Sequence, residues 1–138
     1  MDHICHTTYN PTDSPFITET ADAPNSYTKL DIGPKTIELY HNCISQYRTA
    51  VWNGPLGVFG IPTYATGSFS IAKDMVDGTQ ERGLLSSTRG GASANAAELC
   101  GHASRVSHVS AGGGASLDLL EDKVLPDISA LDDLEPHC

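Results

Sequence analysis

Residues Ser86–Leu99 read SSTRGGASANAAEL, and this stretch decides the fold class. Small polar residues typical of a strand end lead into the turn Arg89-Gly90-Gly91, and an alanine-rich segment of helical composition follows. A strand, a glycine turn and a helix in this order leave bare N–H groups at the helix start, where many proteins hold a phosphate. The turn does not match the G-x-G-x-x-G dinucleotide pattern, and the chain has no G-x-x-x-x-G-K-[ST] loop.

The same order of elements occurs on both sides of this stretch. The apolar segment Thr49–Asn53 ends at Gly54-Pro55, and the segment Val106–Ser110 is followed closely by the turn Gly112-Gly113-Gly114 and a helix through Leu120. Alternation of this kind predicts an α/β fold with a partial, Rossmann-like parallel sheet. The turns that leave the carboxyl ends of such strands line one crevice, where ligands bind. The pattern therefore favours a phosphate-bearing ligand.

The remaining segments are predicted from their local composition. Residues 7–28 are rich in Thr, Pro, Asp and Asn, which indicates an irregular connection. Pro34 suits the first position of a helix that we expect to reach about Tyr47. The other expected elements are a short strand or turn at 29–32, a helix at 66–76, a strand at 84–88, a helix at 92–100 and an acidic tail at 124–138.

Composition bounds the class of partner. The 138 residues predict one domain at most, and the net charge of −9 argues against nucleic acid or an anionic membrane as a partner. No apolar run approaches the roughly 20 residues that span a bilayer. The N-terminal residues lack the basic and apolar parts of a secretory signal, and the four cysteines are far apart, so we expect reduced thiols and a cytoplasmic location.

Several longer runs resemble one known family. The three that carry the resemblance are LDIGPKTIELY (Leu30–Tyr40), VWNGPLGVF (Val51–Phe59) and VSHVSAGGGASLDLLEDKVLP (Val106–Pro126). They closely resemble the C-terminal part of phosphoglycerate kinases, and DHICHTTYNPTDSP (Asp2–Pro15) and AELCGHASRVSHVS (Ala97–Ser110) fit the same family. The resemblance covers nearly the whole chain and identifies residues 1–134 as an incomplete C-terminal, nucleotide-binding lobe.

This resemblance implies an activity and a set of site residues. The family transfers a phosphoryl group from 1,3-bisphosphoglycerate to ADP, giving 3-phosphoglycerate and ATP with Mg²⁺, between a glycerate-binding and a nucleotide-binding lobe. Phosphoryl transfer of this kind depends on positioning and charge stabilisation. The positions that match nucleotide-binding residues of the family are Leu30, Asn53, Pro55, Val58, Gly90, Gly91 and Ser93. Those that match the turn facing the transferred phosphoryl group are Gly112, Gly113 and Gly114.

The sequence departs from the family at ligand positions. The phosphate loop of the family reads G-G-G-D-[ST], whereas here Arg89 replaces its first glycine and Ala92 its aspartate, which assists the magnesium–nucleotide complex. Gly60 stands where a glutamate grips the ribose. Lys29 replaces a small residue, and Ala111 a threonine. The resemblance therefore implies a phosphate loop that has lost its function, with Mg-ATP or Mg-ADP binding in doubt.

Three functional hypotheses follow. The glycerate lobe and the first part of the nucleotide lobe, with its phosphate-contacting lysine, have no counterpart in this sequence, so we expect a phosphoglycerate kinase portion that is inactive alone. The second hypothesis is a non-catalytic module that binds a nucleotide, an anion or another chain covering the exposed half-sheet. The third is a fragment without function. None of the three includes a metal site in this chain.

Overall fold

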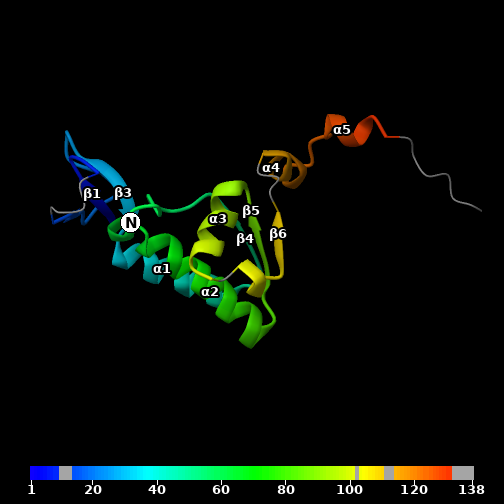
Figure 1. Ribbon diagram of the computed structural model, residues 1–138, viewed down its shortest axis with the longest axis horizontal. Helices are drawn as coiled ribbons and strands as arrows, with labels where there is room; N and C mark the ends of the chain where they lie inside the picture. The colour runs from blue at the N-terminus through cyan, green and yellow to red at the C-terminus, as the bar shows by residue number, and fades with distance from the viewer. Residues whose placement is uncertain (10–13, 102, 111–113, 132–138) are drawn as a thin grey trace, which may run out of the picture.

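The computed structural model describes residues 1–9, 14–101, 103–110 and 114–131. The strands are β1 (His3–His6), β2 (Phe16–Ile17), β3 (Thr28–Ile32), β4 (Thr49–Asn53), β5 (Leu85–Arg89) and β6 (His108–Ser110). The helices are α1 (Pro34–Gln46), α2 (Thr66–Arg82), α3 (Gly91–Leu99), α4 (Gly114–Leu120) and α5 (Pro126–Ser129), with 3₁₀ turns η1 (Pro62–Tyr64) and η2 (Ala103–Arg105). Figure 1 shows an antiparallel sheet at one end and a parallel sheet further along, linked by α1 and α2.

The predicted parallel sheet is confirmed. Its strand order is β4-β5-β6, and both pairs are parallel. Trp52 of β4 lies opposite Thr88 of β5, which in turn lies opposite Val109 of β6. Because registered residues of parallel strands point to the same face, these three define one face of the sheet.

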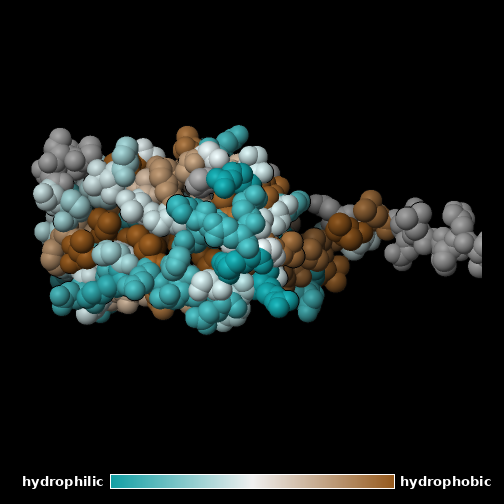
Figure 2. Space-filling model, turned by 90° about the horizontal axis from the view of Figure 1, so that it is seen from below, coloured by the Kyte–Doolittle hydropathy of each residue, from teal (hydrophilic) through white to brown (hydrophobic). Residues whose placement is uncertain are grey.

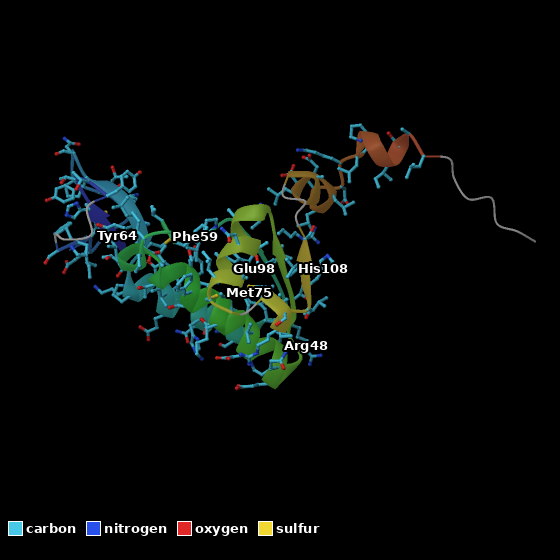
Figure 3. All side chains as sticks on the ribbon, viewed as in Figure 1. Arg48, Phe59, Tyr64, Met75, Glu98 and His108 are labelled. Carbon is cyan, nitrogen blue, oxygen red and sulfur yellow. The ribbon has the colours of Figure 1, made fainter. Side chains whose placement is uncertain are left out.

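Helices α2 and α3 cover that face. The core packs Trp52 against α2 residues Ile71 and Met75 and against α3 residues Ala96 and Ala97. Figure 3 places Met75 where α2 and α3 cross in front of the parallel sheet. On the opposite face, Val51 and Leu85 are 42% and 60% exposed. Parallel sheets are usually covered on both faces, so this chain supplies only one of the two covering layers for the residues described.

A second, antiparallel sheet was not predicted. Its order is β2-β1-β3, and β1 pairs with β3 through a register shift between Ile4 and Cys5. The short strand β2 lies within 7–28, whose other described residues before Thr28 are irregular. Two-residue strands carry no periodic signal, so composition alone reads this segment as a connection.

Two buried aspartates of this sheet region cap the helices that follow. Neither Gly33 before α1 nor Ala65 before α2 caps its helix through a side chain. The carboxylate of Asp2 accepts hydrogen bonds from the backbone N–H groups of Lys35 (3.1 Å) and Thr36 (2.7 Å) in the first turn of α1. A remote residue therefore satisfies helix-start donors that a local cap would otherwise satisfy.

Asp31 performs the same task for α2. One carboxylate oxygen accepts from the N–H of Gly67 at 2.8 Å, and the other accepts from the N–H of Ile32 at 2.9 Å. A Cβ at Gly67 or at Gly57 would overlap with this carboxylate. The two glycines thus allow a backbone approach that no other residue type permits, and the carboxylate joins β3 to the start of α2.

The fold shifts the pKa values of these two carboxyl groups in opposite directions. Burial acts to raise the pKa of Asp2, but hydrogen bonds from the Thr36 hydroxyl and from the Lys35 and Thr36 amides outweigh it and lower that pKa below its ordinary value. Burial dominates at Asp31, where it raises the pKa despite the bonds from Gly67 and Ile32. Asp2 therefore favours the fold when ionised, whereas ionised Asp31 carries a desolvation cost.

Helix α2 extends beyond the predicted end at Val76. It continues to Arg82 and ends at Gly83, whose φ of 68° is the left-handed conformation common after helices. The internal Gly78 suggests an earlier stop, but a Cβ there would lie 2.9 Å from Leu84 Cδ2. Gly78 therefore allows Leu84, which follows the helix, to pack closely against α2, and it does not mark the helix end.

The C-terminal helices project from the rest of the described chain (Figure 1). Their exposed apolar side chains give the hydrophobic surface visible on this projection in Figure 2. The largest exposures are those of Leu119, Leu120, Val124, Ile128 and Leu131. Within the predicted acidic tail, residues 126–129 form α5, and residues 132–138 lie outside the description. No helix among the described residues is both long and apolar enough to span a bilayer.

Replacing Gly67 by alanine tests the close approach at Asp31. The added methyl group forces the carboxylate away from the first turn of α2, which we expect to lower the free energy of unfolding by about 1–3 kcal/mol. Gly60→Ala is the matched control, because no atom lies within 4 Å of its Cβ position. Urea unfolding followed by circular dichroism measures both variants, and equal effects would contradict the assignment.

Acid unfolding tests the cap at Asp2. Its pKa is lower in the folded chain, so its contribution is present above the unfolded-state pKa of about 3.9 and is lost as the pH falls through the folded-state value. We expect Asp2→Asn to be less stable at neutral pH and to lose less further stability on acidification. Urea midpoints from about pH 7 to 3 measure this difference. Asp22→Asn, at an exposed acidic residue, should retain the original pH profile.

Candidate functional site

The candidate site lies where the three parallel strands end. Asn53, Arg89 and Ser110, the last residues of β4, β5 and β6, lie opposite one another in register. The loops that follow therefore leave the sheet along one edge, as the sequence predicts, and we call this edge the strand-end rim. Of the third loop, residues 111–113 lie outside the described residues, so the predictions for Ala111, Gly112 and Gly113 stay predictions. Gly114 begins α4 in open space.

Ser93 ties two of these loops together. It is fully buried, and its Oγ accepts a hydrogen bond from the backbone N–H of Gly54 at 2.6 Å. The carbonyl of the same glycine accepts from Trp52 Nε1 at 2.6 Å. These contacts give the predicted phosphate-loop serine a structural task between β4 and α3. Asn53 itself is exposed beside them.

The central loop of the rim is a glycine turn before α3. Gly90 has φ 83° and ψ 144°, a conformation that residues with a side chain rarely adopt, and its N–H donates to the carbonyl of Ser110 at 3.0 Å. Gly91 opens the helix with no atom within 4 Å of its Cβ position. The loop therefore has the N–H of Gly90 bonded to β6 and open space beside Gly91, the first residue of α3.

Arg89 changes the charge of this loop. Its Nε is buried and has no hydrogen-bond partner among the described residues. In register with Asn53 and Ser110, it brings a guanidinium group to the face of the sheet opposite α2 and α3. Arg89 thus brings a positive charge to the rim at the end of β5.

A groove of about 300 Å³ lies apart from this loop, between β3 and the chain after β4. Leu30, Pro55 and Val58 line it together with Lys29, so these predicted positions do meet. The N–H of Val58 donates to the carbonyl of Leu30 at 2.8 Å and fixes one wall to the other. Leu30 is only 2% exposed.

The polar groups of the groove differ from those that the family resemblance implies. His3 and Asp31 also line it, and burial, then the charge of Lys29, lowers the pKa of His3. Gly60 is exposed and offers no side chain to a ribose. The groove is therefore lined by the cation Lys29, and position 60 supplies no carboxylate to it.

The residues present do not fit a magnesium ion. Hard divalent cations take oxygen ligands, and Ala92, exposed in the first turn of α3, supplies none. Among the described residues no three His, Cys, Asp or Glu side chains come close enough to hold a metal. Both carboxylate oxygens of Asp31 already accept backbone hydrogen bonds. No step of a reaction is therefore assigned to a metal in this chain.

Sequence reasoning missed the two capping aspartates. Asp31 lies directly between two candidate groove residues and supports both the groove and α2. A charged residue between two apolar residues just before Gly-Pro is the signal that could have found it, because such a residue is buried only with partners.

A parallel sheet with helices packed on it and glycine loops at its strand ends places the chain in the class of open α/β folds. Comparison with known proteins gives the family. The family model for phosphoglycerate kinase matches residues 1–123. The chain belongs to the phosphoglycerate kinase family.

Relatives and solved structures agree with this assignment. The chain is 52% identical over 135 residues to the cytosolic phosphoglycerate kinase of Leishmania major, covering 98% of this chain and 32% of that protein. It is 56% identical over 135 residues to phosphoglycerate kinase A of Trypanosoma brucei brucei, covering 98% of this chain and 26% of the relative. The phosphoglycerate kinase structure from Coxiella burnetii matches with a TM-score of 0.81 at 30% identity, covering 93% of this chain and 32% of that one. The chain thus spans about a third or less of these proteins.

Replacing Ser93 by alanine tests its structural task. The variant leaves the N–H of Gly54 without its acceptor in a partly buried setting, which we expect to cost about 1–3 kcal/mol of unfolding free energy. Ser87→Ala is the matched control, because the Ser87 hydroxyl is buried without a partner among the described residues, so its loss is near neutral or stabilising. Urea midpoints compare the two, and an unaffected Ser93→Ala would contradict the assignment.

Proposed function

We propose that residues 1–134 form a C-terminal portion of a phosphoglycerate kinase nucleotide lobe, with the strand-end rim toward the nucleotide phosphates. The observation that carries the proposal is the alignment of Asn53, Arg89 and Ser110 at one edge, followed by loops with exposed glycine backbone. Backbone N–H groups at such loops favour anions. The groove of Leu30, Pro55 and Val58 then faces the base and ribose.

The family reaction is phosphoryl transfer between 1,3-bisphosphoglycerate and ADP. Holding two substrates in line is worth about 7–11 kcal/mol of barrier, and a second substrate site is needed to hold the glycerate. The eight Lys and Arg residues are scattered through the sequence and form no basic cluster that could do so. We therefore propose that turnover requires parts of a phosphoglycerate kinase outside this chain.

Nucleotide binding by the chain alone is proposed to be weak and independent of magnesium. Ala92 removes the oxygen that would assist the metal, and Gly60 removes the ribose grip. Arg89 and Lys29 instead add positive charge at the rim and the groove. An anion can gain from these cations without a metal, but it loses the contacts that would orient it.

A second candidate function is a module that docks on another protein. The uncovered sheet face with Val51 and Leu85 favours it, because sizeable apolar surfaces on one molecule commonly mark interaction sites. Either function is compatible with the expected cytoplasmic location, which stays a prediction because the relatives include the glycosomal phosphoglycerate kinase of Leishmania mexicana as well as the cytosolic one of Leishmania major.

Calorimetry with ADP tests the proposed binding mode. We expect weak uptake that is the same with and without Mg²⁺, because Ala92 supplies no oxygen ligand and no three His, Cys, Asp or Glu side chains of the described residues come together to hold the metal. Arg89→Ala should weaken it further by removing the cation. Tight uptake that requires Mg²⁺ would contradict the proposal.

A coupled assay for ATP formation tests turnover separately. The purified chain should give none, and neither should the triple variant Arg89→Gly, Ala92→Asp, Gly60→Glu, because restored ligand groups still lack the opposing substrate site. The cytosolic enzyme of Leishmania major serves as the positive control. ATP formed by the triple variant would show that the chain needs no further parts.

A further inference from the structure

The groove between β3 and the chain after β4 combines apolar walls with a lysine. Leu30, Pro55 and Val58 supply the walls, and the volume of about 300 Å³ is at the small end of the range for ligand pockets. Lys29 lines the same groove from an exposed position of β3. Its ammonium group carries three hydrogen-bond donors and no acceptor. The charged group of the groove mouth therefore recognises acceptor atoms on a ligand.

The carboxylate that lines the groove is already engaged by the backbone. Asp31 is only 2% exposed. One of its oxygens accepts from the N–H of Gly67 at 2.8 Å, and the other accepts from the N–H of Ile32 at 2.9 Å. A ligand that offered an N–H donor to this carboxylate would therefore compete with the start of α2 for it.

Backbone carbonyls on both sides of the groove are engaged as well. The carbonyl of Leu30 accepts from the N–H of Val58 at 2.8 Å. In the loop after β4, the carbonyl of Gly57 accepts from the N–H of Phe59 at 2.9 Å. The carbonyl of Val58 accepts from the N–H of Ile61, also at 2.9 Å. The loop thus uses its own acceptors to hold its shape, which leaves these carbonyls poorly placed to receive a donor from a ligand.

His3 does not favour either kind of ligand atom. Burial, then the charge of Lys29, lowers the pKa of His3, so the imidazole is neutral at pH 7. A neutral imidazole has one donor and one acceptor nitrogen and can serve either. The difference between ligands consequently depends on Lys29, which can only donate.

Purine bases differ at the edge that such a groove distinguishes. Guanine presents two neighbouring acceptors, N7 and the 6-oxygen, and hypoxanthine has the same pair, whereas adenine presents N7 beside a 6-amino donor. A lysine pairs with both acceptors of the first edge and meets a donor on the second. We infer that the groove selects a 6-oxopurine nucleotide over an adenine nucleotide, with Lys29 as the specificity-determining residue. The inference rests on the proposed nucleotide binding and adds the class of base to it.

Calorimetry with IDP and ADP tests the choice of base, because these two nucleotides differ only around carbon 6 of the purine. Without Mg²⁺, we expect the chain to bind IDP at least about fivefold more tightly than ADP, the lower end of what a bidentate base contact provides. Lys29→Gln should reduce this ratio to one or below, because an amide accepts from the 6-amino group of adenine and donates to N7.

Lys35→Gln is the matched control. It removes the same charge by the same substitution at an exposed residue of α1 that does not line the groove. The control should weaken both nucleotides slightly and retain the preference for IDP. Circular dichroism checks that both variants are folded, and Lys29→Ala serves as a second variant that should also abolish the preference.

Two results overturn the inference while nucleotide binding itself stands. One is ADP binding as tightly as IDP, and the other is a preference for IDP that survives both substitutions of Lys29. If neither nucleotide binds, the proposed nucleotide binding fails together with the inference. The comparison of IDP with ADP therefore separates a wrong assignment of the base from a wrong assignment of the ligand class.

Discussion

The carboxylate of Asp31 is the contact on which the arrangement of this chain depends. Asp31 is a residue of β3. Its carboxylate accepts a hydrogen bond from the N–H of Gly67 at the start of α2 and lies against Gly57 of the loop after β4. A buried carboxylate without such donors would cost several kcal/mol, so the group is stable only when these segments meet around it. Because the groove and the start of α2 share this one group, the position of the groove follows from a packing constraint.

The carboxylate of Asp2 caps the start of α1 in the same way. Together the two aspartates join the antiparallel sheet to both long helices. Those helices then carry the connection across the molecule, since α2 packs under Trp52 of the parallel sheet. The candidate rim lies at the far end of this chain of contacts. Its geometry is therefore supported by packing contacts that lie outside the rim.

The parallel sheet, its strand ends and α3 could be predicted because local signals agree with the fold: β-type residues, then glycine, then helix formers. The antiparallel sheet could not, because β2 is two residues long and pairs with remote β1. The rim was predictable from topology alone. The bond from Gly54 to Ser93 was not, because it joins loops 39 residues apart whose approach depends on the whole layer.

The residues at positions 60 and 92, where the family resemblance implies ligand groups, leave these packing contacts intact. Ala92 and Gly60 are exposed, and Gly60 has no neighbour within 4 Å of its Cβ position, so neither change disturbs the fold. In contrast, Gly57, Gly67 and Ser93 sit in contacts that would fail with a larger or apolar side chain. Packing constrains the second group, whereas under the proposed function only ligand chemistry would constrain the first. Under the proposed function, a chain can thus keep the backbone shape of its relatives at high identity and still lack the groups that would contact a nucleotide.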